Sequence, residues 1–365
     1  MKKILENTLA LGFGCLVGIL LMEGVLRIYN PISPRVKGNR IVLPANKRYV
    51  LKNKDIPGIP EKIVHTKNNL GFRGPDKPAA DFDSTLSIVA VGGSTTECLY
   101  LPDGYDWPAL LGDSLKPYFK RLWINNAGLD GHSSFGHLVL LKDYIVKLRP
   151  KTVLFLMGRN DVGNMGDTGF EASHVKGPLL FSSAEALLKS FSAHSELVAT
   201  ALNLYRVLRA RSQGLPHQSV NWSTLEARSF PEPELEGTLR LHAEKFIPQY
   251  EKRLHRLVTI CRENSIFPVF ITQSAMFGPG TDPVSHRDLA AVRVEGWSGY
   301  AQWKILEQYN DVTRRIGQEM QVPVIDLASL MPKNSAYYYD FFHYTEAGSR
   351  EVATLIFSRL LPLLL

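Results

Sequence analysis

Five short apolar segments constrain the fold of this chain more than any other feature of its sequence. Each is four to six residues long, is nearly continuous in apolar character, and is bounded by turn-forming residues such as glycine or asparagine. Strands that are buried on both faces of a parallel sheet have this pattern, because neither face alternates with solvent. We therefore expect strands at residues 86–91, 122–125, 152–157, 267–272 and 323–326.

Helical stretches lie between these apolar segments. The expected helices are residues 107–119, 136–148, 235–264, 301–320 and 344–361. Strands that alternate with helices form βαβ units with right-handed crossovers and a parallel sheet. The sequence therefore predicts an α/β protein, a flavodoxin-like three-layer α/β/α sandwich with a central parallel sheet, which begins at about residue 84.

Two segments fall outside this alternation. Residues 30–83 are rich in proline, glycine and lysine and show no long helical period, so we expect a stalk and a short lead-in segment. Residues 163–234 are too long for a plain connection, and we expect a lid or a peripheral insertion with a helix near residues 184–211. The expected domains are an anchor at 1–29, the stalk and lead-in segment, and the α/β domain at 84–365.

The N-terminus holds a largely apolar run from residue 9 to residue 28, which only Glu23 and Arg27 interrupt. About 20 apolar residues in a helix span the hydrocarbon core of a bilayer. Glu23 and Arg27 are four residues apart, so they share a helix face and can pair near the membrane interface. A cleavable signal peptide is the alternative, but no small-residue cleavage site is evident. We expect an uncleaved, single-pass anchor that contacts the membrane through residues 9–28.

The formal net charge of +7 does not indicate a nucleic-acid-binding protein, because the basic residues are scattered and form no recognisable motif. Part of the excess lies at the end of the apolar run and just after it, where basic side chains are attracted to anionic lipid. These residues are Arg27, Arg35, Lys37, Arg40, Lys47, Arg48, Lys52 and Lys54. We expect a membrane and no nucleic acid among the partners.

The three cysteines, Cys15, Cys98 and Cys261, show no metal-ligand spacing. A disulfide between Cys98 and Cys261 stays open at this point. Two ordinary buried thiols are the simpler interpretation, because free cysteine behaves as a small apolar residue.

Small or polar residues follow the first three expected strands. Ser94 comes directly after two glycines, Gly131 ends the loop after the second strand, and Asn160 follows the third. Ligands bind outside the carboxyl ends of the strands in an open parallel sheet, so we expect these three residues to lie close together. Asp340 and His343 lie three residues apart in the loop before the last helix.

These five residues suit nucleophilic catalysis by a serine. A serine hydroxyl needs an adjacent base, and that base needs an acceptor that fixes its tautomer. We therefore expect Ser94 to be the nucleophile, His343 the base and Asp340 the carboxylate that orients it. The tetrahedral intermediate needs preorganised donors for its oxyanion. The expected donors are the backbone N–H of Ser94, the backbone N–H of Gly131 and the side-chain amide of Asn160.

Together these segments resemble the four sequence blocks of the SGNH (GDSL-like) hydrolase superfamily, in its membrane-anchored bacterial branch. The resemblance covers roughly residues 68–362 and includes the lead-in residues 69–74, which resemble a segment before the first block in many bacterial members. In one departure, Gly93 stands where the familiar Gly-Asp-Ser motif has aspartate. That aspartate is not a member of the catalytic triad, so the expected roles are unchanged.

The resemblance implies a serine esterase or acylhydrolase, with an O-acetyl group on a surface polysaccharide or a lipid as the first expectation. An acyltransferase that uses the same triad in polysaccharide modification is the nearest alternative. A catalytically silent, glycan-binding component is the other. The implied location is the bacterial inner membrane, with the domain on the periplasmic or extracytoplasmic side, and no cofactor or metal ion is expected.

Two other hydrolase classes fit the sequence less well. The nucleophile elbow of α/β-hydrolases has glycine two residues after the serine, a position that Thr96 occupies. His132 and His137 do not provide the ligand spacing of a metal hydrolase, so we expect a loop residue and a helix-surface residue. Arg73 and Arg159 are candidates for contact with an anionic or polyhydroxyl substrate, with structural ion pairs as the alternative.

Overall fold

A computed structural model describes residues 1–32, 34–38, 40–54, 56–165, 188, 190–212, 219–230 and 232–365. The chain divides into two compact units. One consists of Met1–Pro44 and His174–Pro216, and the other consists of Ala45–Ser173 and His217–Leu365. We describe each unit separately, and the predicted domain boundaries stay predictions.

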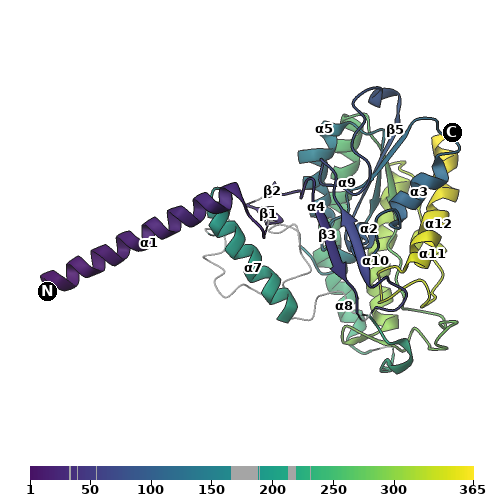
Figure 1. The fold of residues 1–365 in the computed structure, drawn as a ribbon. Helices are drawn as coiled ribbons and strands as arrows, with labels where there is room; N and C mark the ends of the chain where they lie inside the picture. Colours follow the sequence, from purple (N-terminus) through teal and green to yellow (C-terminus); the bar gives the residue numbers. More distant parts are fainter. Residues whose placement is uncertain are drawn as a thin grey trace. The chain divides into compact units, whose positions relative to one another are not determined.

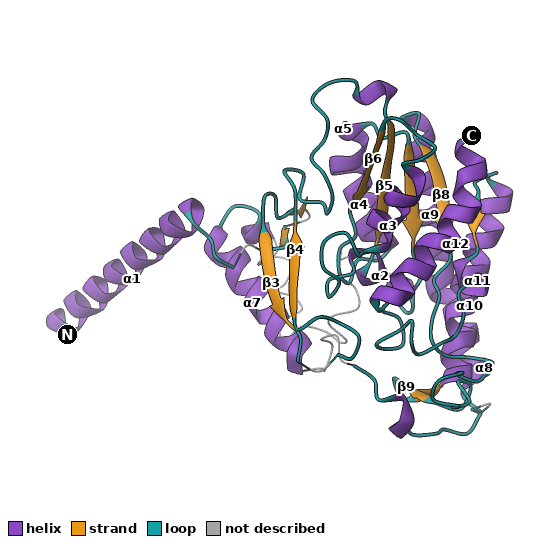
Figure 2. Ribbon diagram, turned by 45° about the vertical axis from the view of Figure 1, so that its right-hand side comes forward, coloured by secondary structure: helices purple, strands orange, loops and turns teal. Residues whose placement is uncertain are grey.

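A five-stranded parallel sheet forms the centre of the second unit (Figure 2). Its strands are β5 (Leu86–Gly92), β6 (Leu122–Asn126), β7 (Thr152–Leu156), β8 (Phe267–Ile271) and β11 (Val324–Ile325). They lie in the order β6-β5-β7-β8-β11, and every neighbouring pair is parallel. Counted along the chain, this is the 2-1-3-4-5 order of flavodoxin-like folds, so the predicted fold class is confirmed. All five strands lie at the expected segments.

Helices cover both faces of this sheet (Figure 1). They are α2 (Ser94–Glu97), α3 (Trp107–Leu115), α4 (Ser134–Leu140), α5 (Val146–Leu148), α8 (Leu235–Leu241), α9 (Ile247–Glu263), α10 (Gly299–Glu319), α11 (Leu327–Leu330) and α12 (Glu346–Leu364). Single π-helical turns join α4 to α5 and α8 to α9. Helices α3 and α12 lie on one face, and α4 and α9 lie on the other. Trp107 of α3 and Ile356 of α12 share an apolar cluster with Ile88 of β5.

A β-hairpin precedes the sheet. Strand β3 (Arg48–Lys52) pairs antiparallel with β4 (Lys62–Thr66). Ile63 and His65 of β4 are buried, whereas the residues between and beside them are not, so one face of the hairpin packs inward. Ile63 belongs to the same apolar cluster as α3 and α12. Residues 45–83 of the stalk and lead-in segment are therefore built into this unit, which their composition did not indicate. A second short hairpin joins β9 (Arg293–Val294) and β10 (Trp297–Ser298).

The other unit contains α1 (Lys2–Ile28), α7 (Glu196–Ser212) and the short antiparallel strands β1 (Val36–Lys37) and β2 (Arg40–Ile41). Among the described residues, α1 is the helix long and apolar enough to cross a membrane, a criterion that a signal sequence also meets. Glu23 and Arg27 form the expected ion pair, with 2.8 Å between Oε1 and Nε. Part of the predicted helical stretch 184–211 lies outside the described residues, and α7 overlaps its C-terminal half.

Candidate active site

Two glycines bring Ser94 to the carboxyl end of β5. A Cβ atom at Gly92 would lie 2.1 Å from Oγ1 of Thr96, so a side chain there would obstruct the turn from β5 into α2. A Cβ atom at Gly93 would lie 2.4 Å from Nδ2 of Asn160. An aspartate at position 93 would therefore displace Asn160. The departure from the Gly-Asp-Ser motif fits the close approach of this amide to the serine turn.

Ser94, His343 and Asp340 form a continuous hydrogen-bonded chain. The Oγ atom of Ser94 lies 2.7 Å from Nε2 of His343, and Nδ1 of His343 lies 2.6 Å from Oδ2 of Asp340. The other oxygen of Asp340 accepts hydrogen bonds from the N–H groups of Phe342 and His343, both at 2.8 Å. One carboxylate thus closes its own turn and also orients the imidazole. The ring of Tyr339 stacks on that imidazole, with centroids 5.6 Å apart.

Gly131 lies in a tight turn after β6. The N–H of His132 donates to the carbonyl of Leu129 at 3.1 Å, which closes a four-residue turn with Asp130 and Gly131 at its centre. Gly131 has a φ of +75°, the left-handed conformation that a type II turn requires at its third position. A side chain would be strained there, so glycine is the residue that this turn needs.

Asn160 lies in a 3-10 turn, Arg159–Asp161, just beyond β7. Its Nδ2 atom donates to the carbonyl of His132 at 3.1 Å, which ties the loop after β7 to the loop after β6. An amide nitrogen carries two hydrogens, so this bond leaves the second one for an incoming oxygen. The structure thus brings Asn160 to the serine turn, as expected.

A small cleft opens beside Ser94. It is lined by Gly93, Ser94, Thr95, His132, Leu156, Met157, Gly158, Arg159, Asn160 and Gln273. Gly131 does not line it, although its neighbour His132 does. Gln273 was missed by our reading of the sequence, but it follows β8, and the rule that placed Ser94 and Asn160 at strand ends would have found it. Its Oε1 atom accepts a hydrogen bond from Oγ1 of Thr95 at 3.2 Å.

Asp161 is buried behind Asn160 and paired with Arg253 of α9. The Nη2 atom of Arg253 lies 3.1 Å from Oδ1 of Asp161, and Nε of Arg253 donates to Oγ of Ser134 at 2.7 Å. The backbone N–H of Ser134 also donates to Asp161, at 3.1 Å. Ser134 begins α4 and Asp161 ends the Asn160 turn. The pair therefore ties together the loops that follow β6 and β7.

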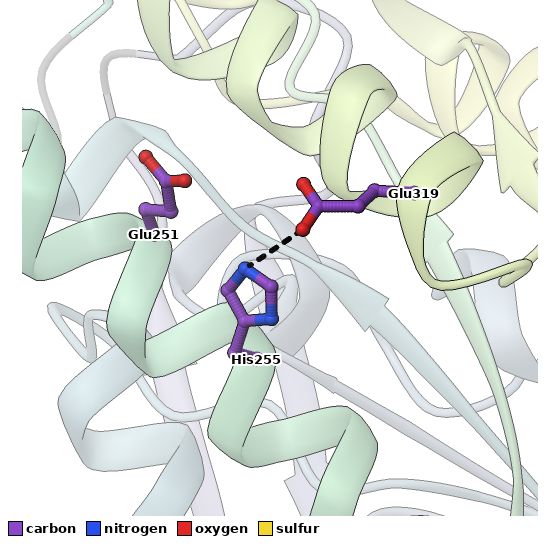
Figure 3. Close-up of side chains that lie close together, drawn as sticks. All are labelled: Glu251, His255 and Glu319. Atoms are coloured by element: carbon purple, nitrogen blue, oxygen red, sulfur yellow. Dashed lines mark ion pairs between the residues drawn. The ribbon is translucent and has the colours of Figure 1, made fainter.

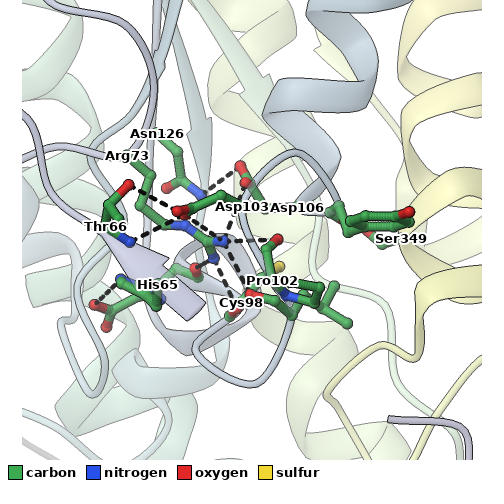
Figure 4. Close-up of polar contacts among 12 residues, drawn as sticks. His65, Thr66, Arg73, Cys98, Pro102, Asp103, Asp106, Asn126 and Ser349 are labelled. Atoms are coloured by element: carbon green, nitrogen blue, oxygen red, sulfur yellow. Dashed lines mark hydrogen bonds and ion pairs between the residues drawn. The ribbon is translucent and has the colours of Figure 1, made fainter. Parts of the chain in front are cut away.

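The two arginines singled out in the sequence have different surroundings. Arg73 is buried and donates to the carbonyls of Glu97 and Cys98 at 2.7 and 2.8 Å, and to those of Leu101 and Pro102 at 2.9 and 3.0 Å (Figure 4). These four carbonyl bonds make Arg73 structural. By contrast, Arg159 lines the cleft.

Arg159 is held over the cleft by two contacts. Its guanidinium group pairs with Glu295 at the tip of the β9–β10 hairpin. It also lies 4.3 Å from the ring centroid of Phe342, next to the predicted base His343. The edge of the cleft therefore carries an ion pair and not an uncompensated positive charge.

Of the two histidines in the Gly131 region, His132 is a loop residue as expected, whereas His137 needs a correction. His137 was expected on a helix surface, but its side chain is buried within α4, and His132 is a buried loop residue. The period of α4 did not show this, because both faces of this short helix are covered. Burial lowers the pKa of His137 to about 3, so its imidazole is neutral at pH 7.

This buried imidazole predicts sensitivity to acid. Below pH 6.5 the unfolded chain binds a proton at His137 that the folded chain does not, so stability is present above that pH and is lost as the pH falls toward 3. The loss is about 1.4 kcal/mol for each pH unit. We expect His137→Gln to flatten the fall in urea-unfolding free energy between pH 7 and pH 5. Parallel curves for the two proteins would contradict this prediction.

One further group of side chains has the composition of a metal site. Glu251, His255 and Glu319 place their ligand atoms within 4.8 Å of one another (Figure 3). Arg315, however, binds both oxygens of Glu251, at 3.1 and 2.9 Å. These hydrogen bonds lower the pKa of Glu251, so the group is an ion-pair network in which an arginine already neutralises the carboxylate.

The cysteines form no disulfide. Cys15, Cys98 and Cys261 are all free, and the last two are buried. Burial raises the pKa of Cys98 and of Cys261 to about 12, so both are inert thiols at neutral pH. The disulfide between Cys98 and Cys261 that the sequence left open is therefore not formed.

The chain is similar to a known protein family and to several solved structures. Residues 90–351 match the GDSL-like Lipase/Acylhydrolase family. Among solved structures, the acetylxylan esterase Axe2 from Geobacillus stearothermophilus is 13% identical, with 76% of this chain and 94% of that chain covered at a TM-score of 0.43. A putative lipolytic protein of the G-D-S-L family from Desulfitobacterium hafniense DCB-2 is 11% identical, with 75% and 99% covered at 0.40. No curated protein matches.

Proposed function

Because this chain belongs to the GDSL-like lipase/acylhydrolase family, we propose that it is a serine ester hydrolase whose catalytic triad is Ser94, His343 and Asp340. Membership of the family supports the hydrolysis of acyl esters in general. The observation that carries the assignment of the residues is the 2.7 Å contact between Oγ of Ser94 and Nε2 of His343, with Asp340 on the other ring nitrogen.

The chemistry follows from these contacts. Oγ of Ser94 attacks the ester carbonyl while its proton moves to Nε2 of His343, and Asp340 stabilises the imidazolium that forms. The oxyanion is stabilised by the backbone N–H groups of Ser94 and Gly131 and by Nδ2 of Asn160. Collapse of the intermediate breaks the bond to the alcohol, which takes the proton from His343. Water then attacks the acyl-enzyme by the same route and releases the carboxylic acid.

The size of the cleft favours a short acyl group, with acetyl as the first choice. The cleft beside Ser94 has a volume of only about 10 Å³, whereas sites that hold drug-sized ligands usually measure about 300–1,000 Å³. Leu156 and Met157 form its apolar part and leave little room for a long acyl chain. The Arg159–Glu295 ion pair at the edge suits a polar carrier of the acyl group more than a purely apolar one.

We also propose where the enzyme acts. Helix α1 meets the length and hydropathy requirements of a membrane span. A single-pass anchor of this kind would hold the hydrolase at the surface of a bacterial inner membrane, on the extracytoplasmic side. The acyl carrier would then be a surface polysaccharide or a lipid within reach of the tether.

The experiment that tests this function uses the full-length protein in detergent micelles. We expect turnover of p-nitrophenyl acetate, slower turnover of the butyrate and octanoate esters, and a fluorophosphonate adduct that mass spectrometry maps to Ser94. A folded protein that neither hydrolyses these esters nor forms the adduct would rule out the hydrolase. Faster turnover of octanoate than of acetate would rule out the short acyl group.

A further inference from the structure

We propose that Glu97 is a positioning residue for the turn that carries Gly131, and that Lys67 of the lead-in segment holds Glu97 in place. The proposal rests on the proposed function, since it concerns the oxyanion donors of that site. It adds a part of the chain that precedes residue 90, where the match to the family begins.

Glu97 joins the serine turn to the Gly131 turn. It is the last residue of α2, three residues after Ser94, and its side chain is buried. One carboxylate oxygen, Oε2, accepts a hydrogen bond from the backbone N–H of Asp130 at 2.6 Å. The other, Oε1, accepts one from Nζ of Lys67 at 3.0 Å. A single carboxylate therefore connects the nucleophile's helix, the lead-in segment and the residue next to Gly131.

The hydrogen bond between Asp130 and Glu97 affects Gly131 because of the geometry of the turn. A four-residue turn uses the N–H of its last residue, His132, and leaves the N–H groups of Asp130 and Gly131 unused by the turn itself. Glu97 takes the first of these. The second, the N–H of Gly131, is the proposed oxyanion donor. The hydrogen bond with Glu97 therefore fixes the peptide plane between residues 129 and 130. The next peptide plane carries the Gly131 N–H, which has to point at the substrate oxygen.

Lys67 supplies the charge that a buried carboxylate requires. It follows β4 directly, its N–H donates to the carbonyl of Lys47 at 2.7 Å, and its side chain is buried. His65 lies on the same strand with Nε2 4.0 Å from Oε1 of Glu97. Burial lowers the pKa of His65 to about 3, so this ring is neutral. The ammonium group of Lys67 is therefore the cation that pairs with Glu97.

A third lead-in side chain acts on the same turn. Arg73 donates to the carbonyl of Glu97 itself and to that of Cys98, as Figure 4 shows for Cys98. Residues 65–73 thus contact both the backbone and the side chain of the segment that follows Ser94. Arg73 fixes the position of the backbone. Glu97, which Lys67 holds in place, fixes the Gly131 turn relative to this backbone through its hydrogen bond with the N–H of Asp130.

A positioning role predicts a kinetic effect that is separate from stability. We expect Glu97→Met, which has no oxygen to accept the Asp130 N–H, and Lys67→Met each to lower kcat for p-nitrophenyl acetate about 10- to 100-fold, because misplacing a catalytic group by about 1 Å costs about 100-fold. KM should change less than threefold. The Lys67→Arg variant should keep most of the activity, and Lys62→Met, an exposed change on the same strand, serves as the matched control.

The second readout is independent of activity. Hydrogen exchange followed by mass spectrometry on the full-length protein should show faster exchange in the peptide that covers residues 127–133 in both variants, and unchanged exchange in the strands of the sheet. The double variant Glu97→Met/Lys67→Met removes both buried charges and the acceptor of the Asp130 N–H at once. It should fold as well as wild type and should still show the fast exchange and the low kcat.

Three outcomes decide the proposal. A kcat within twofold of wild type, with unchanged exchange at residues 127–133, would overturn it. Exchange that rises equally throughout the sheet would overturn it as well, because it would indicate general destabilisation. If the wild type shows no esterase activity, the proposed function fails, and the exchange of residues 127–133 in Glu97→Met still decides whether Glu97 positions this turn.

Discussion

Replacing Ser94 with alanine is expected to lower kcat for p-nitrophenyl acetate by about 10⁶-fold, to the rate that binding and the oxyanion donors alone sustain. His343→Ala should cost about as much, because an unassisted serine hydroxyl is a weak nucleophile. Asp340→Asn should cost about 10⁴-fold, since an amide at this position favours the wrong tautomer of His343. A double variant of Ser94 and His343 should be no slower than either single variant, because the two act as one unit.

Two further variants test whether the loss of activity is specific to the residues of the candidate site. Asn160→Ala should lower kcat by about 10²- to 10³-fold, since it removes one oxyanion donor and leaves the others. Ser114→Ala, on the side of α3, should leave the rate unchanged, because among the described residues its Oγ bonds only to the carbonyl of Leu110 one helical turn earlier. Fluorophosphonate labelling should vanish in Ser94→Ala and persist in Ser114→Ala. If Ser94→Ala keeps more than a tenth of the wild-type rate, the proposed nucleophile is wrong.

Replacing Arg253 with methionine is expected to lower the free energy of unfolding by about 3–5 kcal/mol at pH 7. Both Asp161 and Arg253 are buried, and the guanidinium group also donates to Oγ of Ser134 and to the carbonyl of Met165. Removing Arg253 leaves a buried carboxylate without its countercharge. Asn160 precedes Asp161, so the same variant should also lose esterase activity.

The pH dependence of this loss has a definite sign. Burial raises the pKa of Asp161, and Arg253 is the main group that opposes this rise. Without Arg253 the folded-state pKa of Asp161 is higher still, so the folded variant can bind a proton that the unfolded chain has lost. The variant is therefore expected to be closest to wild type at low pH and to fall further behind as the pH rises to 7.

Unfolding in guanidinium chloride at pH 5 and pH 7 measures both the loss of stability and its pH dependence. The double variant Arg253→Met/Asp161→Asn should recover part of the stability, because it removes the uncompensated charge. Arg256→Met, an exposed change on the same helix, should stay within about 0.5 kcal/mol of wild type. An Arg253→Met variant within 1 kcal/mol of wild type at pH 7 would show that the buried pair contributes little.

The sequence by itself determined the sheet and most of the candidate site. Apolar runs such as residues 152–157 predict buried strands because a strand covered on both faces has no polar side. Ser94 and Asn160 could then be placed at one edge, since all parallel strands end there. Asp340 and His343 were predictable as a pair because they lie three residues apart, and their contact depends on one local turn.

Only the tertiary structure decided which distant polar residues support that site. Lys67 pairs with Glu97 across 30 positions of sequence, and Asp161 pairs with Arg253 across 92. Neither pair produces a local sequence pattern, and the sequence does not distinguish a buried arginine in α9 from an exposed one. His137 was misassigned for the same reason. Periodicity reports which way a side chain faces, whereas burial depends on what packs against that face, and that is settled only when the whole chain has folded.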